Sequence, residues 1–284
     1  MTTKVASEGG IGRRAAGHPW FHRLSRGGLV SRGILYLLVG WLAVRIGLGI
    51  GGGKEADRKG ALQTIVETPG GTVALWGMTL GFAGLALWQF SEARYGKPVP
   101  DGDKATKRLT ALGRAVVYTA GLASTLGFLL GQGAESSDEQ SRSYTARAMA
   151  EPGGRWLVFA IGAAFIGWGL FVLGHALRRT FLKDLKTGQM GRTARRLVEP
   201  LGIAGNTARG LVGGAVGGFL VHAALTFQPD KAKGLDGTLR QFAGTPAGRW
   251  GLVAVAVGLL LFGGYSFCEA RWRKVEAVPA RQGR

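Results

Sequence analysis

Residues 152–176 read PGGRWLVFAIGAAFIGWGLFVLGHA, and this stretch decides the fold. From Trp156 to Gly174 it contains 19 consecutive residues without a charged side chain. An α-helix of that length rises by about 28 Å at 1.5 Å per residue, which is close to the roughly 30 Å hydrocarbon core of a bilayer. The stretch therefore predicts a transmembrane helix.

Five other stretches of the chain have the same character. They are Gly33–Ile50, Thr72–Ser91, Ala115–Gly131, Gly210–Phe227 and Trp250–Phe267. The Lys, Arg, Asp, Glu and His residues within them are Arg45 and His222 alone. The sequence therefore predicts an all-α membrane protein with six transmembrane helices.

Glycine supports this prediction, because helices in lipid associate by close backbone packing rather than by the hydrophobic effect. The chain has 50 glycines among 284 residues. Pairs at four-residue spacing predict small-residue stripes on single helix faces, and they are Gly77/Gly81, Gly127/Gly131, Gly210/Gly214 and Gly213/Gly217.

An internal repeat appears when the chain is aligned on Pro69, Pro152 and Pro246, each of which precedes an even-numbered apolar stretch. An aromatic residue follows each proline by 19 positions, as Trp88, Phe171 and Tyr265. An arginine directly precedes each odd-numbered stretch, with Tyr36, Tyr118 or Gly213 four residues after it. The repeats predict three tandem helical hairpins with a pseudo-threefold relation. Their expected boundaries are 24–97, 98–187 and 188–274, between an N-terminal segment 1–23 and a tail 275–284.

The loop inside each hairpin contains a short segment that ends at the proline. Leu62, Ile65 and Val66 in the first loop, and Leu239 and Phe242 in the third, have helical spacing. These patterns predict short amphipathic helices over 61–68, 144–151 and 238–245 that lie in the membrane interface.

The repeated residues resemble a known family. Ser31-Arg32-Gly33-Ile34-Leu35-Tyr36 and Trp88-Gln89-Phe90-Ser91-Glu92-Ala93 are similar to motifs of bacterial membrane proteins built from three copies of the domain of unknown function DUF1206. The resemblance covers residues 24–274. It implies the same topology, and it implies no activity.

Charge predicts the orientation, because cytoplasmic loops of membrane proteins are enriched in Lys and Arg. The termini and the linkers between hairpins hold 25 Lys and Arg and 8 Asp and Glu, whereas the loops inside the hairpins hold 10 and 9. We therefore expect both termini in the cytoplasm and the protein in the bacterial inner membrane. The net charge of +19 then indicates contact with anionic lipid headgroups rather than nucleic acid.

Six residues form the strongest candidate site, and each lies at the linker end of a predicted helix: Arg32, Glu92, Arg114, His175, Arg209 and Glu269. In antiparallel hairpins, Arg32 would pair with Glu92 and Arg209 with Glu269, while His175 would leave Arg114 without an acid. The structural interpretation is a clamp that closes each hairpin. The alternative is a polar cluster on the threefold axis that carries an ion, a proton or a headgroup phosphate.

Two polar residues lie within the apolar stretches, Arg45 and His222. We expect both to extend towards the outer interface. The alternative is that they line a polar cavity with Gln63 or Glu67. Cys268 is expected to be a packing residue, since a single cysteine cannot form an internal disulfide.

The predicted helices contain no paired acids, no Ser/His/Asp set and no metal-ligand spacing, and no segment outside them is long enough for a catalytic domain. We therefore expect no enzymatic activity, cofactor or metal. Two functions remain: a membrane component that contacts lipids, other membrane proteins or its own copies, and a small channel or carrier for an ion or solute.

Overall fold

The computed structural model describes residues 19–50, 55–95, 105–131, 136–243 and 248–273. Residues 1–18 of the predicted N-terminal segment, the predicted tail 275–284 and the side chain of Phe242 lie outside these described residues. Six described helices are long and apolar enough to cross a membrane. They are α2 (Pro19–Gly47), α4 (Gly71–Tyr95), α5 (Ala105–Leu129), α7 (Gly154–Leu177), α8 (Arg192–Thr226) and α10 (Gly248–Trp272).

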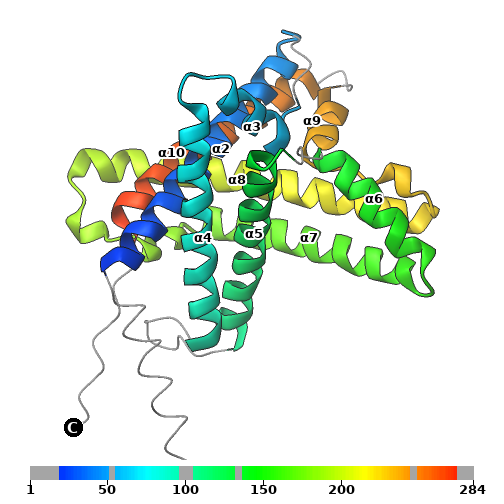
Figure 1. Cartoon of the computed structure of the whole chain (residues 1–284), viewed down its shortest axis with the longest axis horizontal. Coiled ribbons are helices and arrows are strands. Elements are labelled where there is room, and N and C mark those ends of the chain that lie inside the picture. The colour runs from blue at the N-terminus through cyan, green and yellow to red at the C-terminus, as the bar shows by residue number, and fades with distance from the viewer. Residues whose placement is uncertain (1–18, 51–54, 96–104, 132–135, 244–247, 274–284) are drawn as a thin grey trace, which may run out of the picture.

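Three short helices connect the long ones in the predicted places. They are α3 (Arg58–Val66), α6 (Ser137–Ala150) and α9 (Leu235–Ala243). Leu62 and Ile65 of α3 are buried against the long helices, while Val66 is exposed. The buried apolar face of α3 therefore packs on the bundle. All three short helices lie near one end of the molecule, which we call the short-helix end (Figure 1).

Helix α8 is much longer than predicted, because it begins at Arg192 rather than near Gly210. Its first half contains Pro200, which is exposed, so the carbonyl that loses its helical hydrogen bond faces outward. The opposite side of this half packs closely on aromatic rings. A Cβ atom added to Gly202 would lie 2.2 Å from the ring of Phe181.

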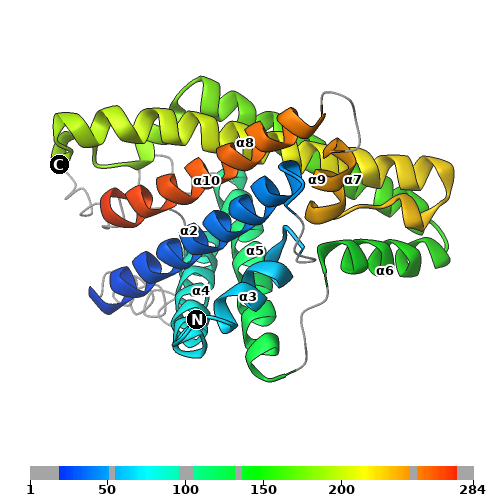
Figure 2. The ribbon, with the colours of Figure 1, turned by 90° about the horizontal axis from the view of Figure 1, so that it is seen from above.

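The long helices associate as three antiparallel pairs, α4 with α5, α7 with α8, and α10 with α2 (Figures 1 and 2). In each pair, the second helix of one repeat lies along the first helix of the next, and α10 closes the order by packing on α2. Helices α2 and α4 also touch, as do α8 and α10. Helices α5 and α7 diverge, and over their described lengths they do not pack along each other.

Glycine permits the close approach of α7 and α8. A Cβ atom on Gly169 of α7 would lie 2.6 Å from the carbonyl oxygen of Gly210 in α8, and one on Gly217 would lie 2.6 Å from that of Gly162. The glycines in direct contact are thus seven residues apart in each helix. The predicted pair Gly213/Gly217 also packs on α7, because a Cβ atom on Gly213 would lie 2.3 Å from the ring of Trp168. A Cβ atom added to Gly214 or Gly77 would have no atom within 4 Å, so the side-chain positions of these two members of the predicted stripes face open space.

Candidate functional site

Arg32 of α2 lies at the centre of a polar cluster that joins three long helices. Its Nη2 forms an ion pair with Glu269 of α10, its Nε donates to Ser266 Oγ at 3.1 Å, and its Nη1 donates to Tyr118 Oη at 3.2 Å. The guanidinium carbon is 5.1 Å from the ring centroid of Phe262. Each of the three guanidinium nitrogens of Arg32 therefore donates to an acceptor inside the bundle, and the guanidinium lies near an aromatic ring.

Arg273 completes this arginine cluster, which we define as Arg32, Tyr118, Ser266, Glu269 and Arg273. Its Nη1 is 3.4 Å from Glu269 Oε1, so the buried carboxylate serves two arginines. Its guanidinium carbon lies 4.8 Å from the ring centroid of Trp88 in α4. The negative charge of Glu92 in α4 also stabilises the charged form of Arg273. The cluster thus connects three repeats at the linker end of the bundle.

The predicted pairing within hairpins is wrong. Arg32 binds Glu269 rather than Glu92, and Arg209 lies over the rings of Trp168 and Phe262, at 5.0 Å and 4.9 Å from their centroids. The physical reason is that the second helix of each repeat packs on the first helix of the next. Glu269 of repeat 3 therefore meets Arg32 of repeat 1.

This order also changes the interpretation of His175. Glu269 of repeat 3 binds Arg32 of repeat 1. By the same packing order, the arginine that His175 of repeat 2 would meet is Arg209 of repeat 3, and not Arg114 of its own repeat. Arg209 contacts Trp168, which comes from the same helix as His175. The imidazole itself stacks on Phe171, with 5.5 Å between ring centroids. Arg209 thus has aromatic faces where Arg32 has a carboxylate.

The same contact explains why Gly213 replaces the repeated tyrosine. Tyr36 packs edge-on against Phe262, with ring centroids 4.6 Å apart. Gly213 holds the corresponding position in α8, and a Cβ atom there would lie 2.3 Å from the larger ring of Trp168. The contact of Trp168 with Gly213 is therefore equivalent to the contact of Phe262 with Tyr36. The larger tryptophan ring compensates for the missing tyrosine side chain.

Arg45 and His222 lie near the short-helix ends of α2 and α8. Arg45 is half-buried and His222 is exposed. Neither side chain has a hydrogen bond or ion pair with any described residue. Their extension towards an interface stays a prediction. In the same described ranges, no three His, Cys, Asp or Glu residues lie close enough together to share a metal ion.

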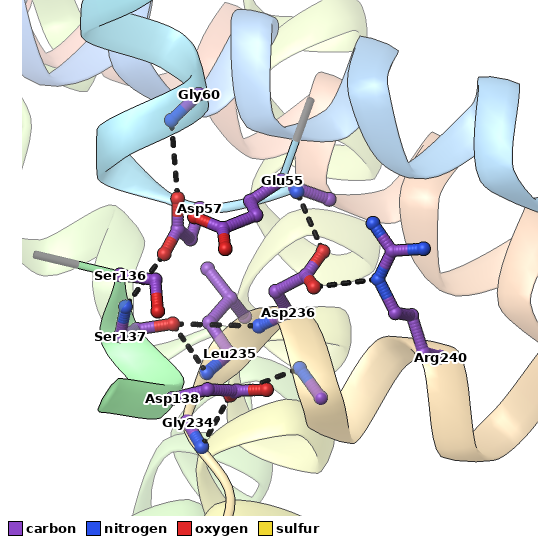
Figure 3. Close-up of polar contacts among 12 residues, drawn as sticks. Glu55, Asp57, Gly60, Ser136, Ser137, Asp138, Gly234, Leu235, Asp236 and Arg240 are labelled. Atoms are coloured by element: carbon purple, nitrogen blue, oxygen red, sulfur yellow. Dashed lines mark hydrogen bonds and ion pairs between the residues drawn. The ribbon is translucent and has the colours of Figure 1, made fainter. Parts of the chain in front are cut away.

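Three carboxylates at the short-helix end form a second polar site, which we call the carboxylate ring: Asp57, Asp138 and Asp236 (Figure 3). Asp57 caps helix α3 by accepting from the amide of Gly60 at 3.1 Å. Its other oxygen accepts from the amide of Ser137 at 2.7 Å, at the start of α6. Repeat 1 thereby binds repeat 2.

The other two carboxylates continue this order around the bundle. Asp138 Oδ1 accepts from the amides of Gly234 and Gly237, at 2.8 and 3.0 Å, and so binds repeat 2 to repeat 3. Asp236 Oδ1 accepts from the amide of Ala56 at 2.7 Å and binds repeat 3 to repeat 1. Sequence reasoning missed this ring, because its donors are backbone amides. The available signal was one aspartate near the start of each short helix.

Replacing Asp236 with alanine is expected to destabilise the fold by about 2–3 kcal/mol, because the buried amide of Ala56 loses a charged acceptor. The thermal unfolding temperature in detergent measures this effect. Asp230→Ala, at an exposed aspartate six residues earlier, is the matched control and should change the temperature little. Equal effects of the two variants would contradict the structural role of Asp236.

Glu55 lies beside the ring, and its pKa is raised. Burial is the largest cause, the negative charges of Asp57 and Asp236 add to it, and Lys59 partly offsets it. The ionised form is thus disfavoured in the fold, so the contribution of Glu55 to stability is present below its ordinary pKa of about 4.5 and is lost as pH rises through the raised value. Glu55→Gln should therefore raise the unfolding temperature at about pH 7 and give no advantage at about pH 4. A benefit independent of pH would contradict this account.

The three repeats match a known protein family. A family model described as "Domain of Unknown Function (DUF1206)" matches the chain three times, over residues 27–96, 109–179 and 204–273. The "Uncharacterized protein YxxB" of Bacillus subtilis (strain 168) is 32% identical over 253 residues, which cover 88% of this chain and 90% of that protein. No solved structure matches the chain.

Proposed function

The chain belongs to the DUF1206 family, and from its packing we propose that it is a non-enzymatic component of the bacterial inner membrane that binds lipids or other membrane proteins. Its acidic groups support a structural rather than a catalytic use. Glu269 binds two arginines, and Asp138 and Asp236 bind backbone amides of the next repeat. No described extramembrane element forms a separate domain.

We further propose that the three repeats are related by a pseudo-threefold axis. Two kinds of contact support this relation. The close approach of Gly263 to Gly33 and that of Gly169 to Gly210 use equivalent positions of successive repeats. The carboxylate ring runs in the same order, from repeat 1 to 2, from 2 to 3 and from 3 to 1.

The observation that favours a component over a channel is an apolar layer between the two polar sites. Leu42 of α2 and Leu252 of α10 lie along their helices between the arginine cluster and the carboxylate ring, and both are buried. Val212 of α8 and Leu239 of α9 pack into the same layer. A water-filled path would need a continuous polar stripe through this region.

Vesicle permeability tests this proposal. Vesicles containing the purified chain and an entrapped pH-sensitive or potassium-sensitive dye should respond to imposed gradients no faster than empty vesicles. The matched variant Leu252→Asn, which adds a polar group to the apolar layer, checks that a leak would be detected. Rapid flux through the unmodified chain, slowed by a larger side chain at Val212, would overturn the component proposal in favour of a channel.

The proposed orientation places both termini in the cytoplasm. It is supported by the excess of Lys and Arg at the linker end. A reporter fused after Arg284 should be active only in the cytoplasm, and one inserted within residues 136–140 only outside it. The opposite pattern would reverse the orientation and leave the helix packing unchanged.

A further inference from the structure

Three arginines occupy the same position of the repeat, and they have three different environments. Arg32 binds Ser266, Tyr118 and Glu269, and Arg209 lies between two aromatic rings. Arg114 of α5 is half-buried, yet among the described residues it has no hydrogen bond, ion pair or ring contact. A guanidinium at the boundary of an apolar bundle thus retains all five donors for another partner.

The register of the repeats shows why Arg114 differs from Arg32. Gln89 of α4 holds the position that Ser266 holds beside Arg32, 20 residues past the proline of its repeat. Gln89 is fully buried, and neither polar atom of its amide has a hydrogen bond. Gly213, which corresponds to Tyr118, has no side chain to offer. The serine and tyrosine that bind Arg32 are thus replaced, in the register of Arg114, by a buried glutamine without a hydrogen bond and by a glycine.

The charges that act on Arg114 come from several elements. Arg273 and Glu269 belong to α10, and Asp184 belongs to the 3₁₀ helix η1 (Thr180–Asp184) that follows α7. Glu269 is already bound to Arg32 and Arg273. Asp184 is exposed and forms no ion pair with any described residue, Arg114 included. Among the described residues, therefore, no carboxylate forms an ion pair with the Arg114 guanidinium.

Arg114 belongs to one of the two least covered long helices. In both α5 and α7 only 22% of the most apolar stretch is buried, the lowest share among the six long helices, and the two helices diverge (Figure 2). Val116 and Val117 lie two and three residues after Arg114 on α5 and are 59% and 60% exposed. Phe171 of α7, one turn before His175, is 61% exposed. A basic group therefore lies at the linker end of two uncovered apolar helices.

We propose that Arg114 binds the phosphate of an anionic phospholipid whose acyl chains lie along the exposed faces of α5 and α7. This inference rests on the lipid-binding role proposed above and names its site. A phosphodiester supplies the acceptors that the guanidinium lacks, and the apolar helix faces accept the chains. A free anion would contact only the arginine and would not cover the apolar helix faces. A protein helix would cover those faces but would not bring a phosphate-like acceptor to the arginine. The adjacent charge of Arg273 disfavours the ammonium of a zwitterionic headgroup.

Native mass spectrometry of the full chain in detergent tests the proposal. Phosphatidylglycerol should be retained in preference to phosphatidylcholine, and Arg114→Gln should lower its occupancy about tenfold, which corresponds to the loss of roughly 1.4 kcal/mol. Arg195→Gln, at an exposed arginine of α8, removes the same charge and should leave occupancy unchanged. Equal lipid retention by the unmodified chain and Arg114→Gln would overturn the proposal, as would equal losses in both variants.

Two further arms keep the test decisive. If Arg114→Gln does not fold, Arg114→Lys replaces it. This variant keeps the charge but loses the planar five-donor guanidinium, so it should fold and bind phosphatidylglycerol severalfold more weakly. Unchanged binding there would contradict the site. Inorganic phosphate at millimolar concentration should not displace the lipid, and full displacement would identify a free-anion site instead. If the chain shows no lipid selectivity and its vesicles remain impermeable, the proposed lipid site at Arg114 is contradicted. The proposed non-channel function would then still stand.

Discussion

Replacing Glu269 with glutamine should destabilise the fold by about 3–5 kcal/mol, because two buried arginines lose their shared carboxylate. Arg32 and Arg273 would remain inside the bundle with their charges and without a counterion. For a chain of this size, such a loss lowers the thermal unfolding temperature by roughly 10 °C. Thermal unfolding in detergent, followed by circular dichroism, measures the effect.

The control is an ion pair of the same kind at an exposed place. Arg179 and Glu199 are paired, with 61% and 32% of their side chains exposed, so Glu199→Gln should cost less than about 1 kcal/mol. A double-mutant cycle should show strong coupling between positions 32 and 269, and little between 209 and 269. Coupling between Arg209 and Glu269 would restore the pairing within hairpins and contradict the structure.

Replacing Gly217 with valine should have a comparably large effect on the pair α7 and α8. An added Cβ atom would lie 2.6 Å from the carbonyl oxygen of Gly162 and 2.8 Å from the amide nitrogen of Ile166. Backbone atoms cannot move aside as a flexible side chain can, so the helices must separate along their contact. We expect a loss of about 3 kcal/mol, at the upper end for overpacked sites, and a lower unfolding temperature.

Gly214 offers a matched control, because it lies one turn earlier on the same helix and has no atom within 4 Å of an added Cβ. Gly214→Val should therefore change stability only through the helix preference of valine, by a few tenths of a kcal/mol. If the two substitutions have equal effects, the close contact between α7 and α8 is not the one described.

The sequence predicted the elements well, because their signals are local. Charge-free stretches near 20 residues predicted the six long helices, and the spacing of Leu62 and Ile65 predicted a short helix that packs by one face. The helices themselves were therefore readable. The start of α8 was missed, since the residues around Pro200 are too polar for a membrane pattern and become helical through packing on Phe181.

The neighbours of each helix could not be read in the same way. A repeat defines the residues of each hairpin, but it does not say whether Glu269 meets the arginine of its own repeat or of another. The contact between Arg32 and Glu269 spans 237 positions of the chain, and it depends on α10 closing onto α2. Gly213 replaces the repeated tyrosine and His175 replaces the repeated acid. Both replacements can be explained only when the packing order of the repeats is known.

The carboxylate ring was hidden for a different reason. Aspartates near helix starts are common caps, and Asp57 does cap α3. Nothing in the sequence indicates that its second oxygen accepts from the amide of Ser137, because every residue except proline carries such a donor. A bond from a side chain to a backbone amide leaves no pattern at the partner position.

The central claim is that α10 closes the order of repeats by packing on α2, and a cysteine cross-link tests it most directly. A Cβ atom on Gly263 would lie 2.8 Å from Leu37 Cγ, so cysteines at positions 37 and 263 fall within disulfide reach once the leucine is removed. With Cys268→Ser to remove the native thiol, mild oxidation in membranes should cross-link this pair and not the pair formed by position 37 and the exposed Val257. Absence of the link between 37 and 263, in a variant that folds and inserts normally, would contradict the closed order of repeats.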